Sequence, residues 1–297
     1  MSEAAPSSVF RFAPTPNGAL HLGHAYSALM NQRRAGETGG RLLLRIEDLD
    51  RSRCKRLHED AIRFDLAWLG VGFDGAPRRQ SEHTADYAAR LSRLEQAGLV
   101  YPCFCSRAEV ARAAVGRDPD GAPLYSGACR ALTGAQRRAR LARGDKAARR
   151  LDMGRALAAV AGPLAWIEYG EGTAAETRIA DPAAWGDVVL GGRDLAASYH
   201  LAVTVDDALQ GVTDVVRGRD LLAATSVHRL LQALMGLPAP RYRHHRLVLD
   251  PAGGKLAKSR GSPSLADLRA QGISAAEVVQ ALGFGRADAP AFEVALS

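Results

Sequence analysis

The sequence predicts an α/β protein with a parallel sheet of the nucleotide-binding type, and two observations carry this prediction. Within residues 8–48, a short apolar run, a turn rich in proline and glycine, a helical pattern and a second apolar run follow one another. Strand, helix and strand in that order form a βαβ unit, whose strands lie parallel. From about residue 184 onwards, apolar runs of the same kind return. We therefore expect a sheet domain built from both halves of the chain.

The elements of the first unit follow in order. Residues 8–13, "SVFRFA", alternate in hydropathy and stop at Pro14, as a strand would. The stretch "HLGHAYSALMNQRRAGE" has apolar residues at helical spacing and ends near Gly39 and Gly40. "RLLLRIED" then has the nearly continuous apolar character of a buried strand.

The remaining elements predict a split domain. Two amphipathic helices are expected near 55–69 and 84–97, and the texture then changes to cysteines, basic residues and glycine-rich turns. After "WGDVVLGG" we expect "YHLAVTVDDALQGVTDVVRG" to form strands and turns, followed by a helix over 221–236. The predicted domains are a split nucleotide-binding domain (1–100 and 184–260), an inserted subdomain (101–183) and a short C-terminal segment (261–297).

The net charge of +7 is concentrated in one segment. Between Arg130 and Arg150 the chain carries eight basic residues and only one acid, Asp145, so the rest of the chain has no net charge. A basic segment of this kind favours a polyanionic partner such as nucleic acid, because neutralising phosphates is the main sequence-independent source of affinity. A solvated arginine-rich helix explains the same pattern equally well. The basic residues are Arg130, Arg137, Arg138, Arg140, Arg143, Lys146, Arg149 and Arg150.

Composition excludes several classes of protein. The apolar stretches are short and interrupted by charge, so we expect no membrane span, and the N-terminus does not resemble a signal peptide. Four cysteines do not form a disulfide framework of a secreted domain, and we expect a cytoplasmic protein. Cys54 stands apart from the other three and is expected to be a buried, small apolar residue.

The first motif with chemical content is "PTPNGALHLGH" at residues 14–24. A turn from strand to helix at the edge of a parallel sheet is where α/β proteins bind nucleotides, and the helix N-terminus favours phosphate. His21 and His24 lie one helical turn apart and can donate ring N–H groups to phosphate oxygens. Gly18 and Gly23 allow an adenine or a phosphate to approach the backbone closely.

The second motif is "GGKLAKSRGS" at residues 253–262. Lys255 and Lys258 stand three apart in a loop rich in glycine and serine. Two ammonium groups of this kind suit the charge that develops on pyrophosphate as it leaves ATP. Alone the motif is weak, because solvated basic loops are common. Together with the histidine pair it indicates an ATP site.

The two motifs resemble the signatures of class I aminoacyl-tRNA synthetases. "HLGH" resembles the HIGH motif and "KLAKS" resembles KMSKS, with Ala257 where a serine is common. "RFAPTPNGALHLGHA", "LLLRIEDLD" and "YHLAVTVDD" with "GVTDVVRGRDLL" are similar to the glutamyl branch, and the resemblance covers most of the chain. It implies a Rossmann-like catalytic domain with an inserted zinc-containing α+β subdomain and a short C-terminal helical region.

Only 38 residues follow Ser259, which is too few for the anticodon-binding domain of an ordinary glutamyl-tRNA synthetase. A catalytic core of this kind, with "CFC" in its insertion, resembles the glutamyl-queuosine tRNA(Asp) synthetases. The resemblance implies activation of L-glutamate with ATP and transfer to the queuosine base in the anticodon of tRNA(Asp). No obligate protein partner is expected, and a monomer is assumed.

The resemblance also assigns the substrate sites. Glutamate needs cations for its carboxylates and one acid for its ammonium group, which Arg11, Arg217 and Glu47 can supply. A surface position for Arg11, or an ion pair of Glu47 with Arg45 or Arg51, is the alternative. The implied glutamate-binding residues are Arg11, Phe12, Ala13, Pro14, Thr15, Glu47, Tyr199 and Arg217. The implied ATP-binding residues are Pro14, Gly18, His21, Gly23, His24 and Lys258, and Lys255 assists the chemistry.

Two metals are expected. Mg²⁺ accompanies ATP, although the sequence offers no dedicated carboxylate cage, and Asp206 and Asp207 either line the site or cap a turn. Cys103, Cys105 and Cys129 supply three thiolates, whereas zinc prefers four tetrahedral ligands. The resemblance assigns Tyr125 as the fourth ligand of a structural Zn²⁺. Three reduced cysteines without metal are the alternative.

Two other functions remain open on the sequence. One is a truncated glutamyl-tRNA synthetase that charges the 3′ end of its tRNA. The other is a non-catalytic tRNA-binding paralogue, although the retained histidine pair and both loop lysines favour an enzyme.

Overall fold

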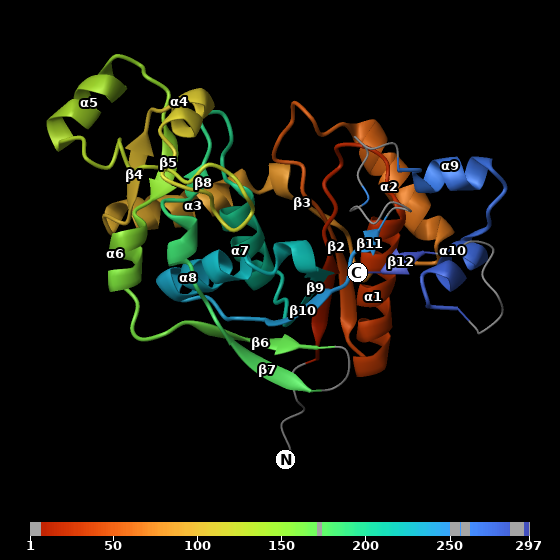
Figure 1. Ribbon diagram of the computed structural model, residues 1–297. Coiled ribbons are helices and arrows are strands. Elements are labelled where there is room, and N and C mark those ends of the chain that lie inside the picture. Colours follow the sequence, from red (N-terminus) through yellow and green to blue (C-terminus); the bar gives the residue numbers. More distant parts are fainter. Residues whose placement is uncertain (1–6, 171–173, 250–255, 257–261, 286–293, 297) are drawn as a thin grey trace.

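A parallel sheet lies at the centre of the computed structural model, which describes residues 7–170, 174–249, 256, 262–285 and 294–296 (Figure 1). β1 (Val9–Phe12), β2 (Arg41–Ile46) and β3 (Arg78–Arg79) pair in parallel. β9 (Asp214–Gly218), β10 (Arg241–His245) and β6 (Ala165–Tyr169) pair in parallel as well. The backbone N–H of Thr213 donates to the carbonyl of Val9 at 3.0 Å, which sets β9 beside β1. The parallel order is therefore β3-β2-β1-β9-β10-β6, in which the strands of the N-terminal part lie beside β9 and β10, and β6 comes from the predicted insertion.

The first βαβ unit is confirmed. α1 (Leu22–Thr38) begins at His21 and ends at Gly39, whose φ of 61° is the left-handed geometry that glycine tolerates best. α1 packs against β1, β2 and β9. Its apolar side chains join those of β1, β2 and α2 (Arg56–Trp68) in one core.

A second core lies in the other half of the molecule. It is formed by α3 (Thr84–Gln96), α6 (Met153–Ala158), α7 (Tyr199–Leu209), α8 (Thr225–Met235) and β8 (Val189–Gly191). α2, α3 and α8 lie close to the predicted ranges. Short 3₁₀ turns lie at Gln80–Glu82, Ala183–Trp185 and Arg219–Leu221.

One prediction of secondary structure is wrong. The segment "YHLAVTVDDAL" is not a strand but the helix α7, whose N-cap Ser198 accepts a hydrogen bond from the backbone N–H of Leu201. Seven of its residues are buried, so it has no polar face to reveal a helical period. β-branched residues in a buried helix resemble a buried strand, and Val203, Thr204 and Val205 produced that resemblance.

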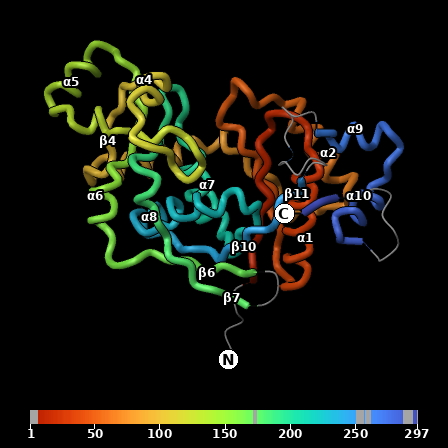
Figure 2. Tube along the Cα trace, in the orientation of Figure 1, coloured from red at the N-terminus to blue at the C-terminus, as the bar shows by residue number. Residues whose placement is uncertain are grey.

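The predicted insertion contributes to two sheets. β4 (Val100–Cys103) and β5 (Ala148–Leu151) pair antiparallel and continue to β8 in a separate sheet. β6 and β7 (Ala175–Ile179) form a hairpin whose first strand joins the central sheet beside β10. α4 (Arg107–Arg112) and α5 (Gly134–Ala142) lie in the lobe that projects away from α1, as Figure 2 also shows. The domain boundaries of the sequence analysis stay a prediction.

The C-terminal part packs on the first core. α9 (Leu265–Ala270) and α10 (Ala275–Ala281) bury leucine and valine side chains against it. β11 (Val248–Leu249) pairs antiparallel with β12 (Ala295–Leu296). Among the residues that the structure describes, no helix has the length and apolar character that crossing a bilayer requires.

Candidate active site

A cavity of about 470 Å³ opens where β1, β2, β9 and β10 end and α1 begins. This is the edge at which open parallel sheets bind their ligands. Most of the predicted site residues line it: Arg11, Phe12, Ala13, Pro14, Thr15, His21, Gly23, His24, Glu47, Tyr199 and Arg217. Lys255 and Lys258 lie outside the described residues. Leu256, which stands between them in the sequence, lines the same cavity.

The two histidines of the first motif sit at the N-terminus of α1 with their rings 3.9 Å apart, centre to centre. Nδ1 of His21 accepts from the backbone N–H of Gly23, and Nδ1 of His24 accepts from the backbone N–H of His21, both at 3.1 Å. In a neutral ring whose Nδ1 accepts, the proton is on Nε2. Each ring therefore carries an Nε2–H donor at the helix end, where phosphate is favoured.

The local geometry explains why two positions of this motif are glycine. A Cβ on Gly23 would lie 3.0 Å from Cε1 of His21, so any larger residue would displace that ring. Gly18 has a φ of 155°, which L residues rarely adopt. It adjoins Asn17, which lines the cavity.

Buried charges surround the predicted glutamate pocket. Asp207 accepts from Nε of Arg11 at 3.1 Å and from Nη1 of Arg45 at 2.8 Å. Burial opposes ionisation of Asp207, but the two guanidinium groups outweigh it and hold the pKa of Asp207 below its usual value. Arg11 is 4% exposed, which excludes the alternative that it is a surface residue.

Glu47 lies 3.5 Å from Arg45 and also lines the cavity. Glu47 thus has the ion pair with Arg45 that one interpretation predicts and the position at the cavity that the other predicts. Burial raises the pKa of the Glu47 carboxyl, although the positive charges of Arg45 and Arg11 oppose that rise. A bound ammonium group at this carboxylate would favour its ionised form.

The alternatives for the aspartate pair are resolved by their contacts. Asp206 is fully buried and accepts from Arg78, Gln80 and Tyr87 at 2.8–3.0 Å. Asp206 ties α7 to the segment around β3, whereas Asp207 holds the two buried arginines. Within the described part of the chain, neither carboxylate accepts from a turn N–H, and neither residue lines the cavity.

Arg217 reaches the cavity from the end of β9. Its Nη1 donates to the hydroxyl of Tyr199 at 3.3 Å. Its other side-chain partners are His228, His244 and Thr225, which the sequence analysis did not single out. They are far apart in the sequence and carry no motif, so only the fold brings them together.

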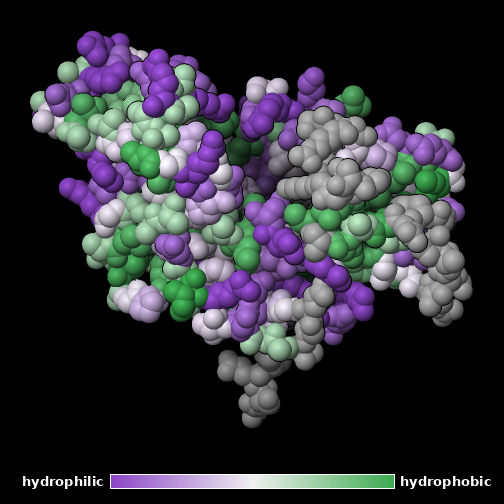
Figure 3. Space-filling model, viewed as in Figure 1, coloured by the Kyte–Doolittle hydropathy of each residue, from purple (hydrophilic) through white to green (hydrophobic). Residues whose placement is uncertain are grey.

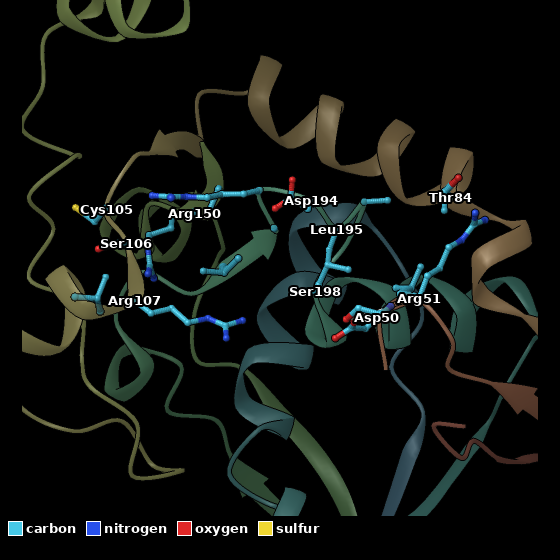
Figure 4. A pocket seen from close by; sticks show the side chains of 18 of the residues that line it. Asp50, Arg51, Thr84, Cys105, Ser106, Arg107, Arg150, Asp194, Leu195 and Ser198 are labelled. Atoms are coloured by element: carbon cyan, nitrogen blue, oxygen red, sulfur yellow. Dashed lines mark hydrogen bonds between the residues drawn. The ribbon is translucent and has the colours of Figure 1, made fainter. Parts of the chain in front are cut away.

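A second and larger cavity, of about 1320 Å³, separates the projecting lobe from the sheet domain. Figure 4 shows Arg107 and Arg150 on one side of it and Arg51 on the other, with Leu195 and Ser198 between them. The space-filling view is hollowed between these two parts (Figure 3). Arg193 also lines this cavity.

The basic segment 130–150 is only partly solvated. Arg140 stacks on the ring of Phe104 at 4.4 Å and Arg150 on the ring of Tyr125 at 4.1 Å. Arg130 pairs with Asp187 at 3.0 Å. Several of these cations therefore support the projecting lobe, and Arg150 also faces the larger cavity.

The three cysteines of the insertion converge. Their sulfur atoms lie within 4.8 Å of one another, and Cys105 and Cys129 are 3.5 Å apart. The hydroxyl of Tyr125 is 3.6 Å from the Cys105 sulfur and accepts from the backbone N–H of Cys129 at 2.7 Å. A tetrahedral zinc with Zn–S bonds of about 2.3 Å needs sulfur atoms about 3.8 Å apart. The donor set fits such an ion with little rearrangement.

One thiol of this cluster, that of Cys129, ionises more readily than an ordinary cysteine. Burial opposes the ionisation of Cys129, but hydrogen bonds from Tyr125 and from the backbone N–H of Phe104 outweigh it and lower the pKa of the thiol. Among the described residues this trio is the only group of three or more cysteine, histidine or carboxylate side chains arranged to hold a metal ion.

Residues 8–285 match the family described as the catalytic domain of class I tRNA synthetases for glutamate and glutamine. A glutamyl-Q tRNA(Asp) synthetase of Rhodobacter capsulatus is 43% identical over 290 residues, which cover 93% of this chain and 99% of that protein.

The chain belongs to the glutamyl-Q tRNA(Asp) synthetase family. It is a class I aminoacyl-tRNA synthetase-like ligase. A glutamate–tRNA ligase of Synechococcus is 36% identical over 89% of this chain, but the match covers only 53% of that protein. A solved glutamate-tRNA synthetase of Elizabethkingia anophelis superposes with a TM-score of 0.75 at 26% identity, over 93% of this chain and 61% of that one. Members of the glutamyl-Q tRNA(Asp) synthetase family thus match this chain over more of their own length than the glutamate–tRNA ligases do.

Proposed function

We propose that this protein activates L-glutamate with ATP and transfers the glutamyl group to the queuosine base of tRNA(Asp). The observation that carries the proposal is the single cavity that joins the paired histidines at the start of α1 to Arg11, Glu47 and Arg217. ATP and glutamate can react only if their binding sites adjoin, because the reacting atoms must be held within reach of each other.

Glutamate presents two carboxylates and one ammonium group. In the proposal Arg217, with the Tyr199 hydroxyl beside it, binds one carboxylate and Glu47 binds the ammonium group. Arg11 lies on the same wall, and the backbone from Arg11 to Thr15 forms the edge of the pocket. Arg11 is already paired with Asp207, so its net charge toward the substrate is smaller than that of Arg217.

The first step joins glutamate to AMP. A carboxylate oxygen of glutamate attacks the α-phosphorus of ATP, a carboxyl–phosphate bond forms, and the bond to the β-phosphate oxygen breaks to release pyrophosphate. The Nε2–H groups of His21 and His24 donate to phosphate oxygens, and we assign Lys255 and Lys258 to the leaving pyrophosphate. Mg²⁺ accompanies ATP. The protein acts through positioning and charge stabilisation, and no covalent enzyme intermediate is needed.

In the second step a hydroxyl of queuosine attacks the glutamyl carbonyl, an ester bond forms, and AMP leaves with the proton. The larger cavity supports an approach of the RNA from the side of the projecting lobe. Arg51, Arg107 and Arg193 line this cavity and suit the phosphates of a nucleic-acid loop. This reaction belongs in the cytoplasm, where tRNA and ATP meet and thiols remain reduced.

We also propose that a structural Zn²⁺ is held by Cys103, Cys105, Cys129 and Tyr125. The ion would join the end of β4 to the loop before α5 and thereby fix one wall of the larger cavity, which Cys105 lines. A site closed by four protein ligands has no open position for catalysis.

The decisive experiment maps the glutamyl group on the RNA. The protein is incubated with ATP, labelled glutamate and tRNA(Asp) with or without queuosine, and the RNA is then digested to identify the labelled nucleotide. Label on queuosine supports the proposal. Label on the 3′-terminal adenosine would make the protein a truncated glutamyl-tRNA synthetase, and failure of glutamate-dependent exchange of pyrophosphate into ATP would make it a non-catalytic paralogue.

A further inference from the structure

Arg217 differs from the other buried arginines of the site in what surrounds it. Arg11 and Arg45 both donate to the carboxylate of Asp207. Among the described residues, no carboxylate forms an ion pair with Arg217, although its side chain is buried and makes several hydrogen bonds. Its charge is held by neutral acceptors alone.

Two of these acceptors are imidazole rings. Nε of Arg217 donates to Nε2 of His244 at 3.1 Å, and both Nη atoms lie 3.3 Å from Nδ1 of His228. A guanidinium group donates and cannot accept, so the facing ring nitrogens must carry lone pairs. The remaining acceptors are the Thr225 hydroxyl at 2.8 Å and the carbonyl of Leu221 at 3.2 Å.

The second nitrogen of each ring is also fixed. Nδ1 of His244 lies 2.9 Å from the Glu168 carboxylate, which can only accept when ionised. Nε2 of His228 lies 3.2 Å from Nδ1 of His200. The contacts therefore require a proton on Nδ1 of His244 and on Nε2 of His228, and both rings are neutral.

We infer that His228 and His244 are positioning residues that hold Arg217 through neutral acceptors and so leave its positive charge for a carboxylate of the substrate. The inference rests on the proposed function of the cavity. Burial and the adjacent guanidinium keep both rings unprotonated, because they lower the pKa of His244 to about 4 and that of His228 well below its ordinary value. The cavity would therefore select a substrate that places a carboxylate, either of its side chain or of its α-carbon, against Arg217.

Arg217 and the residues that hold it come from several elements of the fold. Arg217 comes from β9, His228 from α8 and His244 from β10. Glu168 comes from β6 and accepts further hydrogen bonds from the indole of Trp166 and from the backbone N–H of His244. The guanidinium is thus oriented by three elements of the sheet domain, which leaves it little freedom to turn away from the cavity.

The matched variants His228→Asn and His228→Asp test the inference in the full-length protein. Both side chains place an oxygen near the position of Nδ1, and they differ in charge. Asn should keep the Michaelis constant for glutamate, measured by pyrophosphate exchange, within about threefold of the unmodified value. Asp should raise it by about tenfold or more, because its carboxylate neutralises Arg217, while the Michaelis constant for ATP stays unchanged in both. Equal constants for glutamate in the two folded variants would overturn the inference.

A second pair tests the acceptor at the other ring. His244→Gln keeps an oxygen near Nε2, whereas His244→Leu has a similar bulk and no acceptor. Gln should bind glutamate about tenfold better than Leu. Equal binding by the two would indicate a packing role and overturn the inference at this position.

Nitrogen-15 NMR of the histidine rings provides a readout that needs no activity. The signals are assigned by their disappearance in His228→Asn and His244→Gln. We expect the Nδ1–H form for His244 and the Nε2–H form for His228 at pH 7 without substrate, and an imidazolium or the opposite tautomer at either position would overturn the inference. If unmodified protein shows these tautomers but no glutamate-dependent exchange, the proposed function fails and the orientation of Arg217 stands.

Discussion

Arg45 donates from Nη1 to Oδ1 of Asp207 over 2.8 Å, and both side chains are buried. The same oxygen accepts from Arg11, so one carboxylate holds two guanidinium groups at the base of the proposed glutamate pocket. Removing a partner from a buried pair leaves an uncompensated charge, which costs more than the pair itself contributes.

Asp207→Asn is therefore expected to destabilise the fold. We expect the free energy of unfolding to fall by about 3–5 kcal/mol, since two buried arginines lose their shared counter-charge. Urea denaturation measures the change. Glu37→Gln, at an exposed pair with Arg33 and Arg34, serves as the control and should cost about 1 kcal/mol or less. Similar losses in the two variants would contradict a structural role for Asp207.

The variant His24→Asn should slow the reaction of ATP without weakening the binding of glutamate. The Asn oxygen can replace Nδ1 as the acceptor for the backbone of His21, but no donor replaces Nε2–H. We expect the turnover of glutamate-dependent pyrophosphate exchange to fall by about 10²–10³ while the Michaelis constant for glutamate stays nearly unchanged. An unchanged turnover would show that His24 does not act on ATP.

Zinc content tests the cysteine cluster. Purified protein should contain about one zinc per chain, and Cys105→Ser should lose most of it with a lower melting temperature. Cys54→Ser, outside the cluster, is the matched control and should retain the metal. Tyr125→Phe distinguishes a ligand from a packing residue, because it removes only the oxygen. Metal-free protein with unaltered stability would favour three reduced thiols instead.

The larger cavity makes a separate prediction for RNA. Arg107→Glu and Arg51→Glu should weaken binding of tRNA(Asp) and reduce the salt dependence of that binding by about one counterion each. Pyrophosphate exchange without RNA should stay at the level of the unmodified protein. Arg56→Glu, on the exposed face of α2, is the control. If all three variants bind RNA equally well, the RNA approaches from elsewhere.

His200 is expected to make stability depend on acidity. Burial, assisted by the charge of Arg217, lowers the pKa of His200 to about 4 from an ordinary value of 6.5. Between these values the unfolded chain binds the proton and the folded chain does not. As the pH falls from about 6.5 toward 4, His200 therefore lowers the free energy of unfolding by about 1.4 kcal/mol per pH unit. Above about pH 6.5 it causes no such loss.

Urea titrations from pH 4 to 7 measure this slope. His200→Gln should flatten it, and His83→Gln, on the surface beside Asp86, should not. A slope that is the same in both variants would contradict the assignment. Other buried histidines with lowered pKa values, His228 and His244, add to the acid dependence of the unmodified protein, so the difference between variants is the relevant quantity.

The sequence predicted those parts of the site that local chemistry determines. The cap of α1, the turn before it and the strand ending at Phe12 follow from adjacent residues, and they place the histidine pair at the start of α1, as predicted. α7 was missed because a helix buried on all sides loses its amphipathic period. Its two adjacent aspartates within an apolar run were the available signal, since carboxylates in such a run must have buried cationic partners.

The partners of Arg217 could not be predicted in the same way. His228 and His244 become neighbours only when α8 and β10 fold against β9, and nothing in their local sequence differs from that of ordinary core residues. The pairing of β6 with β10 is equally non-local. Composition and spacing describe neighbours along the chain, whereas these contacts depend on the order of strands in the sheet.

The position of β6 limits how the segment between the two halves of the sheet can be exchanged. A chimaera that grafts another protein's sequence between residues 101 and 183 would remove a strand of the central sheet and, with it, the carboxylate beneath His244. A transplant that stops before Ala165 would keep both. The hairpin of β6 and β7 therefore has to evolve together with the catalytic half, and so do β5 and α6, which pair with β8 and pack in the second core.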